Sequence, residues 1–214
     1  MSHPDRSQFQ ADPSKLLDAM DQFAAQEDFL ISIGSDKRRV ATYVLEEHKP
    51  KILVELGGYV GYSAISFALI MKRLHGKNNS GVKVLSLEFE PRFAEIAREM
   101  IVMAGLPEVV TVVVGAASDS LRTMKADGRL KHIDMLFIDH GEGGIELYGS
   151  DLKLSMELDL LRSHAIILAD NVIRPGAPDY RKFVRSQPGF ESKGVPCLIV
   201  PGDLEDEMEV TRVL

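Results

Sequence analysis

Short apolar runs alternate along this chain with stretches in which apolar residues recur every three or four positions. A short, near-continuous apolar run predicts a buried strand, and the longer periodic pattern predicts a helix with one buried face. Because strands of this character alternate with helices, we expect a parallel sheet that is covered by helices on both faces. The expected strands lie at residues 52–56, 81–87, 109–114, 133–138 and 165–169.

Helices are expected between these strands and before the first of them. The pair Asp12-Pro13 predicts a helix start, since aspartate is a good cap and proline suits the first turn. A second helix is expected at about residues 35–48, and the helix before the fifth strand is expected to continue through Leu161. The apolar segment 28–34, between the first two helices, either forms a lid over a pocket or packs on the core.

The last part of the chain has a different pattern. Two short apolar segments, 197–200 and 209–213, flank an acidic loop at 201–208. Such a pair most simply forms a hairpin, antiparallel to its partner strand. No repeat, linker or low-complexity run divides the chain, so one domain is expected at residues 12–214, after a tail at 1–11.

The first expected strand runs into a turn with three glycines in five residues, 57–61, and then into a helical pattern. Glycines let the backbone approach a ligand closely, and the helix start offers it unpaired N–H groups. The turn lacks the Gly-x-Gly-x-x-Gly spacing of dinucleotide sites and the Lys-Ser/Thr pair of a P-loop. Glu55 would repel a pyrophosphate but could hold a cation such as the amine of S-adenosylmethionine. We therefore expect a methyl donor at this turn.

Acidic side chains follow the ends of four expected strands, at Glu55, Glu88, Asp139 and Asp170-Asn171. Ligands of open α/β sheets bind at this edge, and converging carboxylates repel one another unless a cation lies among them. Two carboxylates and a carboxamide form an all-oxygen set that suits Mg2+. Structural explanations remain open for single residues, because Glu88 could cap a helix and Asp170-Asn171 could belong to a turn.

Residues after the second and third expected strands suit the nucleoside part of such a ligand. Glu88, about thirty residues beyond the glycine turn, could hold two ribose hydroxyls, as the acidic residue of dinucleotide sites does. Phe89 and the pair Ala117-Ser118 could flank an adenine. His140 is either a ligand at this edge or a packed, hydrogen-bonded histidine.

Composition narrows the classes of partner and compartment. With 25 Lys and Arg residues against 32 Asp and Glu residues, the formal net charge of -7 argues against a nucleic-acid surface. No apolar run is long enough for a membrane span, and the N-terminus lacks a signal-peptide pattern. The single cysteine, Cys197, excludes an internal disulfide and a cysteine-rich metal site. We therefore expect a cytoplasmic protein, monomeric or weakly dimeric, that acts on a small molecule.

Segments spread through most of the chain resemble the catechol O-methyltransferase family. They are residues 54–64, 113–116, 134–140 and 169–179. The similarity runs in order from about Asp12 to Arg185, and the segment Asp-Asn-Val-Ile-Arg-Pro-Gly-Ala-Pro-Asp is specific to this family. The resemblance implies a single-domain, Rossmann-like methyltransferase fold and Mg2+-dependent transfer of a methyl group from S-adenosylmethionine to one hydroxyl of a catechol.

The resemblance also implies roles for individual positions. It assigns the metal to Asp139, Asp170 and Asn171. Asn171 and Glu142 are the candidate catalytic residues. Together with the residues discussed above, the candidate cofactor site consists of Ile33, Glu55, Gly57, Tyr59, Tyr62, Ser63, Glu88, Phe89, Ala117, Ser118, Asp139 and His140.

The chain departs from the family at positions that contact the substrate. Gly141 and Glu142 replace the tryptophan and the general-base lysine that follow Asp-His in the family. Phe29 and Ile31 replace a tryptophan and a methionine, and the family's substrate-binding glutamate aligns near Val200. Glu142 could accept the proton, add a ligand to the metal or point to solvent.

These departures keep other functions open. The chain could be a catalytically weak or silent protein that binds S-adenosylmethionine, or it could methylate a different phenol. The three metal-ligand positions argue against a silent binder, which has no need of them. A nicotinamide-dependent oxidoreductase is disfavoured by the spacing of the glycines.

Overall fold

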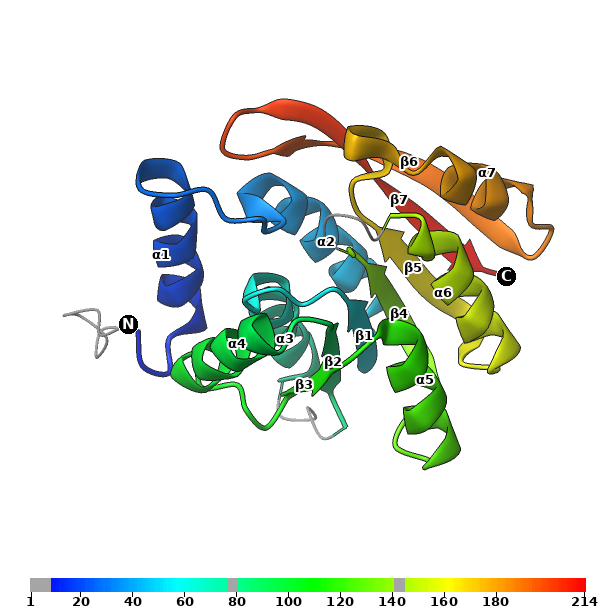
Figure 1. Ribbon diagram of the computed structural model, residues 1–214, viewed down its shortest axis with the longest axis horizontal. Helices are drawn as coiled ribbons and strands as arrows, with labels where there is room; N and C mark the ends of the chain where they lie inside the picture. The colour runs from blue at the N-terminus through cyan, green and yellow to red at the C-terminus, as the bar shows by residue number, and fades with distance from the viewer. Residues whose placement is uncertain (1–8, 77–80, 141–144) are drawn as a thin grey trace.

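The computed structural model describes residues 9–76, 81–140 and 145–214, and within them seven strands form one sheet between helices (Figure 1). The strands are β1 (Ile52–Leu56), β2 (Lys83–Glu88), β3 (Val110–Val114), β4 (Ile133–Ile138), β5 (Leu161–Ala169), β6 (Phe190–Ile199) and β7 (Leu204–Val213). The helices are α1 (Pro13–Gln26), α2 (Gly34–His48), α3 (Tyr62–His75), α4 (Pro91–Met103), α5 (Ala117–Ala126), α6 (Leu147–Glu157), the short π-helical turn η3 (Val172–Gly176) and α7 (Pro178–Ser186).

The first five strands are parallel, as expected. β1 pairs with β2 on one side and with β4 on the other, so the strand order β3-β2-β1-β4-β5-β7-β6 changes direction between β1 and β4. Ligands of doubly wound sheets bind outside the carboxyl ends of the strands at such a point. The fold therefore brings the glycine turn after β1 next to Asp139, which follows β4.

Two apolar cores lie on opposite faces of the sheet, which confirms the expected helices on both faces. Successive residues of β1 point to opposite sides, so Leu53 belongs to one core and Val54 to the other. The first core is covered by α1, α2, α3 and α4, and contains Phe67 stacked edge-on against Phe137. The second is covered by α5, α6 and α7 around the fully buried Tyr148. Burial on both faces explains why these strands are almost wholly apolar.

The C-terminal hairpin is antiparallel, as expected, but its strands are longer than the predicted segments. β6 and β7 pair from Phe190 and Val213 to Ile199 and Leu204. The acidic segment that we expected to be a loop therefore already lies largely in β7. The many acidic residues of this segment made its strand pattern hard to recognise. Asp206 and Met208 are buried, and Glu207 between them is partly exposed, as expected for alternating residues of a strand.

Other element boundaries also differ from the prediction. α6 ends at Glu157, and Leu161, which was expected to continue that helix, begins β5 instead. Helix α7 was not predicted, although Pro178 at its first turn and the buried Tyr180 and Val184 on one face are ordinary helix signals. The expected start at Asp12 is confirmed, since its side chain accepts a hydrogen bond from the Lys15 backbone N–H.

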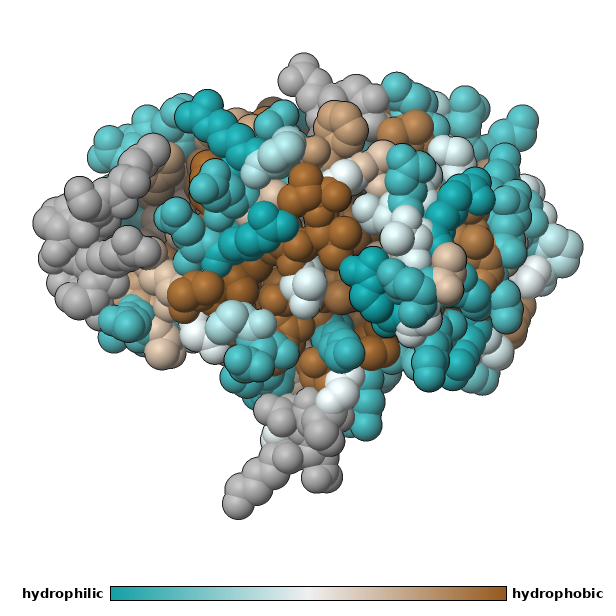
Figure 2. All heavy atoms as spheres, turned by 60° about the horizontal axis from the view of Figure 1, so that its bottom comes forward, coloured by the Kyte–Doolittle hydropathy of each residue, from teal (hydrophilic) through white to brown (hydrophobic). Residues whose placement is uncertain are grey.

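Apolar side chains gather near the middle of the face shown in Figure 2, with hydrophilic side chains around them. Several large apolar residues are exposed in the described part of the chain, among them Phe89 at 74% and Ile31 at 59%.

None of the helices within residues 9–76, 81–140 and 145–214 has the length and apolar character needed to cross a membrane.

Candidate functional site

The glycine turn after β1 is packed directly against the end of β4. Gly57 has a φ of +95°, and a Cβ atom built on it would lie 2.0 Å from the Asp139 carbonyl oxygen. Gly61, with a φ of +90°, caps the start of α3. Both backbone conformations favour glycine, and only glycine fits the contact with β4. The sequence of the turn is therefore explained by a close approach of two strand ends, beside the free N–H groups of a helix start.

Glu88 at the end of β2 organises the same turn. Its Oε2 accepts hydrogen bonds from the backbone N–H groups of Gly58, at 3.0 Å, and Tyr59, at 2.6 Å. Its Oε1 accepts one from the Glu90 N–H at 2.7 Å. The cap of α4 is Glu90, whose side chain accepts from Arg92, so Glu88 does not cap this helix itself. A carboxylate has about four acceptor positions, and one on Oε1 remains for a ligand hydroxyl.

Glu55 is fully buried beneath the turn. Its Oε2 accepts a hydrogen bond from the Ser86 hydroxyl, whereas no partner of its Oε1 lies within the described residues. Burial raises the pKa of this carboxyl to about 7, and the nearby hydroxyls of Ser63 and Ser86 offset part of the effect. An unpaired carboxylate oxygen in this position is suited to a cationic group that enters from the turn.

Two further carboxylates meet at the ends of β4 and β5. Asp170 is held beside β4 by a hydrogen bond of its backbone N–H to the Ile138 carbonyl oxygen, at 3.0 Å. Burial raises the pKa of Asp139 well above its ordinary value, and the negative charge of Asp170 raises it further. Burial also raises the pKa of Asp170, although Lys37 offsets part of this change. The edge of the sheet therefore attracts positive charge.

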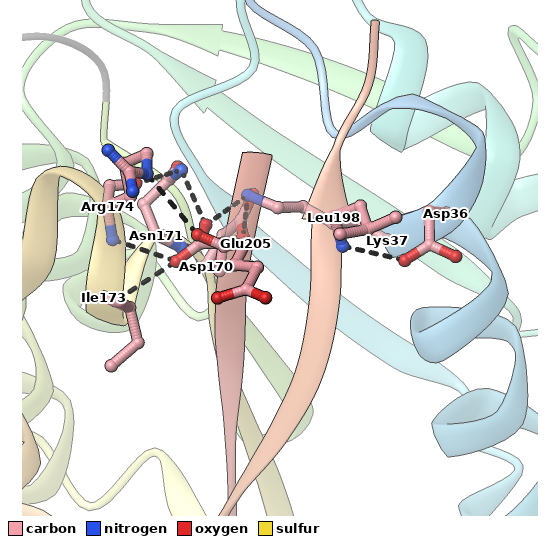
Figure 3. A network of polar contacts seen from close by, with 9 residues as sticks. Asp36, Lys37, Asp170, Asn171, Ile173, Arg174, Leu198 and Glu205 are labelled. Atoms are coloured by element: carbon pink, nitrogen blue, oxygen red, sulfur yellow. Dashed lines mark hydrogen bonds and ion pairs between the residues drawn. The ribbon is translucent and has the colours of Figure 1, made fainter. Parts of the chain in front are cut away.

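A buried lysine supplies part of that charge (Figure 3). The Nζ atom of Lys37, in the first turn of α2, lies 2.6 Å from Asp170 Oδ1 and 2.7 Å from Asp206 Oδ2. Burial lowers the pKa of Lys37, but the two carboxylates outweigh burial and hold the pKa above its usual value. Lys37 is therefore an ammonium ion and not a proton acceptor.

Asn171 is oriented by its neighbours. Its backbone is left-handed, with a φ of 56°, a conformation that asparagine tolerates better than most residues. Its Nδ2 atom donates hydrogen bonds to the Arg174 carbonyl oxygen, at 2.8 Å, and to Asp206 Oδ2, at 3.2 Å. With the amide nitrogen engaged on that side, the amide oxygen Oδ1 is directed away from Asp206.

This arrangement leaves three oxygen donors at one edge. The hydrogen bonds and ion pairs of Asp170 within the described residues involve Oδ1, which accepts from Lys37 and from the Asn171 N–H at 2.7 Å, and not Oδ2. Among the described residues, the Asp139 carboxylate and Asn171 Oδ1 have no hydrogen-bond or ion-pair partner, although the charges of Asp170 and Lys37 act on Asp139. Two carboxylates and one amide oxygen fit a hard cation such as Mg2+. Within residues 9–76, 81–140 and 145–214 no three His, Cys, Asp or Glu side chains are grouped so that they alone could hold a metal ion, so a zinc-type cluster is not found there.

The aromatic candidates of the cofactor site have different surroundings. Tyr59, in the turn, packs edge-on against Phe93 with 4.7 Å between ring centroids. Tyr62 is buried, and its hydroxyl donates to Asp21 of α1 at 2.7 Å, which ties the start of α3 to α1. Phe89 is exposed at 74% and offers a free ring face beside Glu88. Phe89 is therefore the most exposed of these three aromatic candidates, and Tyr59 is half-buried.

The remaining candidates lie around the same edge. Ser63 is buried in the first turn of α3, and Ala117 and Ser118 are the partly exposed first residues of α5. Ile33, at the start of α2, is buried in the first core. The His140 Nε2 atom lies 2.9 Å from Asp151 Oδ2, without the alignment of a hydrogen bond.

The segment 28–34 packs on the core at its end, which agrees with one of the two expectations, and a lid over a pocket stays a prediction. Ile33 packs on the core, whereas Phe29 is exposed at 54% and Ile31 at 59%. A Cβ on Gly34 would lie 2.8 Å from Val200 Cγ2, so the end of this segment touches the end of β6. Gly141 and Glu142 lie outside the described residues.

Sequence reasoning missed Lys37 and Asp206, although each leaves a signal. Lys37 lies on the apolar face of α2, three and four residues before Val40 and Ala41, where a lysine is unusual. Asp206 alternates in β7 with the buried Met208, at a position whose side chain faces inward. A charged residue at a core position indicates a buried partner.

Comparison with other proteins places this chain among O-methyltransferases. The O-methyltransferase family model matches residues 7–180. Catechol O-methyltransferase of Bos taurus is 37% identical over 180 residues, which are 84% of this chain and 62% of that protein, so the chain spans less than two thirds of this relative. Catechol O-methyltransferase of Sus scrofa is 38% identical over 177 residues, which are 83% of this chain and 90% of that protein.

The fold agrees with this assignment. The crystal structure of an O-methyltransferase from Bacillus cereus in complex with SAH superposes with a TM-score of 0.71 at 20% identity, over 94% of this chain and 90% of that chain. At this identity the likeness concerns the fold alone. Since the family model covers most of its length and catechol O-methyltransferases are among its relatives, this chain belongs to the O-methyltransferase family.

Proposed function

We propose that this protein transfers a methyl group from S-adenosylmethionine to one hydroxyl of a catechol-type phenol, with Mg2+ held by Asp139, Asp170 and Asn171. The observation that carries the proposal is the juxtaposition of two features at the switch point of the sheet. One is the glycine turn with its buried, half-paired Glu55. The other is the set of three oxygens at the ends of β4 and β5 that have no hydrogen-bond or ion-pair partner among the described residues. The bovine and pig relatives support the choice of a catechol.

The turn after β1 is the proposed binding site of the methyl donor. The Glu55 carboxylate would face the amine, and Glu88 would accept a hydrogen bond from a ribose hydroxyl while it holds the turn through its two bonds to Gly58 and Tyr59. Phe89 would cover one face of the adenine, with Ala117 and Ser118 nearby. The bound S-adenosylhomocysteine (SAH) of the Bacillus cereus neighbour supports this choice of ligand.

The edge after β4 and β5 is the proposed binding site of the acceptor. A divalent cation bound there lowers the pKa of a coordinated phenol hydroxyl and fixes its orientation. Asp170 and Asn171 would keep their free oxygens towards that site because Lys37 and Asp206 occupy their other polar atoms. Glu142, at the position of the family's lysine, is the proposed proton acceptor.

The proposal is tested by methyl transfer from labelled S-adenosylmethionine to two isomeric diols. Catechol has vicinal hydroxyls that can chelate one cation, whereas resorcinol has the same acidity class but a 1,3 arrangement that cannot. We expect a monomethylated product with catechol and Mg2+, a large loss of rate with resorcinol, and no product with excess chelator. If excess chelator does not change the rate of methyl transfer, the proposed requirement for Mg2+ is wrong.

Because the family's general-base lysine is replaced in this chain, two other results of the assay have to be distinguished. If the chain binds S-adenosylhomocysteine but methylates none of a panel of vicinal diols and simple phenols, it is a silent binder of the cofactor. If it methylates a simple phenol and not a catechol, the acceptor differs from that of the relatives. The exposed Phe29 and Ile31, which replace a tryptophan and a methionine of the family, are the residues to vary in that case.

A further inference from the structure

Lys37 is buried where the proposed cation would be bound, and it is not one of the ligands. Its exposed fraction is 2%, and its partners Asp170 and Asp206 are exposed at 2% and 3%. Lysine is rarely buried to this extent unless its charge is paired. Lys37 reaches this edge because it lies on the inner face of the first turn of α2, which also contacts the hairpin through a hydrogen bond from the Leu198 N–H to Asp36 Oδ2, at 2.8 Å (Figure 3).

Both partners of Lys37 act on the free oxygens of this edge. Asp170 is itself one of the three donors, and Lys37 occupies its Oδ1. Asp206 acts through Asn171, since its Oδ2 accepts from the Asn171 amide nitrogen. The Oδ1 of Asp206 is fixed by the backbone N–H groups of Ile173, at 3.1 Å, and Arg174, at 2.9 Å. Lys37 therefore contacts one donor, Asp170, directly, and it contacts Asp206, which orients a second donor, Asn171.

The formal charges of the cluster formed by Lys37, Asp139, Asp170 and Asp206 would be balanced by one divalent cation. With all four groups ionised, Asp139, Asp170 and Asp206 contribute three negative charges and Lys37 contributes one positive charge, so the cluster carries a formal charge of two negative. A divalent cation would neutralise it. Without Lys37 the same three carboxylates, of which Asp170 and Asp206 are buried, would leave one negative charge unpaired even with the cation bound, and buried unpaired charge is costly.

We propose that Lys37 is the built-in counter-ion of this site: its ammonium group fixes one oxygen of Asp170 and one of Asp206, and thereby sets how strongly the remaining oxygens attract a divalent cation. Lys37 is a positioning residue and does not touch the reacting atoms. The inference rests on the proposed function only through the identity of the site as one for a divalent cation.

The test is a series of full-length variants that changes the charge of the cluster in single steps. Lys37→Met makes it three negative, and Asp206→Asn makes it one negative. The double variant Lys37→Met/Asp206→Asn restores two negative. Lys131→Met, which removes an exposed lysine two residues before β4, is the matched control.

Two readouts are measured on chelator-stripped protein at about pH 8. One is the Mg2+ affinity by calorimetry, and the other is the rise of the unfolding midpoint on addition of saturating Mg2+, which reports preferential binding to the folded state. We expect Mg2+ affinity to change by about tenfold for each unit of cluster charge, tightest in Lys37→Met and weakest in Asp206→Asn. Lys131→Met should resemble the wild type, and the double variant, which restores the charge but not the contacts of Lys37, should lie between Lys37→Met and Asp206→Asn.

The outcomes separate this inference from the proposed function. Equal Mg2+ affinities across the four variants and the wild type would overturn the role of Lys37 while leaving the metal site intact. Absence of Mg2+ binding in the wild type itself would contradict the proposed metal-dependent function. If Lys37→Met does not fold, the comparison of Asp206→Asn with the double variant still changes only Lys37, and equal affinities in that pair would refute the inference.

Discussion

Glu55 makes the stability of the fold depend on pH, and this dependence can be worked out from the structure. Glu55→Gln keeps the size of the side chain and removes its ability to ionise. Burial raises the pKa of Glu55 from 4.5 to about 7. At roughly 1.36 kcal/mol for each pH unit, that difference corresponds to roughly 3 kcal/mol.

The sign follows from the proton held by the folded protein. Below about pH 4.5 Glu55 is protonated in both the folded and the unfolded chain, so its ionisation costs nothing. As the pH rises from 4.5 to about 7, the unfolded chain releases this proton and the folded chain retains it, which lowers the free energy of unfolding of the wild type. Glu55→Gln does not lose stability in this way. Its free energy of unfolding should therefore exceed that of the wild type by a growing amount as the pH rises.

The assay is urea denaturation of the wild type and Glu55→Gln between pH 5 and pH 8.5. The difference in free energy of unfolding between the two proteins should grow by about 2–3 kcal/mol across this range. Contributions of ionisable groups that do not interact with Glu55 cancel in the difference, whereas those of Glu88 and Asp139, which interact with it electrostatically, do not cancel fully. Glu95→Gln, at an exposed position of α4, is the control and should show a constant difference. A constant difference for Glu55→Gln as well would refute the reasoning.

Three further predictions concern the turn, the metal edge and the proton acceptor. Gly57→Ala should destabilise the fold by several kcal/mol more than Gly128→Ala in urea denaturation, because its Cβ would lie 2.0 Å from a backbone oxygen whereas Gly128 has a φ of +77° and nothing within 4 Å. Asp170→Asn should abolish Mg2+ binding in calorimetry and lower methyl transfer at least about a hundredfold, and unchanged Mg2+ affinity would count against this ligand. Glu142→Gln should lower kcat by about a hundredfold and flatten the acidic limb of its pH profile, while an unaltered profile would assign the proton acceptor elsewhere.

The sheet could be predicted from the sequence because its central strands are buried on both faces. β1 and β4 have the bounds that their apolar runs indicate. The hairpin was harder, since β7 is apolar on one face only and begins among acidic residues, so its first half looked like a loop. Helix α7 was hidden for a similar reason, because its start is part of a proline- and glycine-rich segment that reads as a turn.

The candidate site was predictable as far as it follows from strand ends. Asp139 and Asp170 terminate neighbouring parallel strands, and strand order alone brings them together. Lys37 and Asp206 come from α2 and β7, and local patterns do not specify that these two elements meet at the same edge. Their contact depends on the packing of the first helices against the antiparallel hairpin, which is a tertiary property of the fold.

The central claim is that Asp139, Asp170 and Asn171 hold a divalent cation beside the methyl donor. It is tested most directly by a crystal structure of the full chain with Mn2+ and S-adenosylhomocysteine, using the anomalous signal of manganese. The account predicts one strong peak bonded to the Asp139 carboxylate, Asp170 Oδ2 and Asn171 Oδ1, next to the glycine turn. A peak elsewhere, or an ordered S-adenosylhomocysteine with no manganese at this edge, would contradict it.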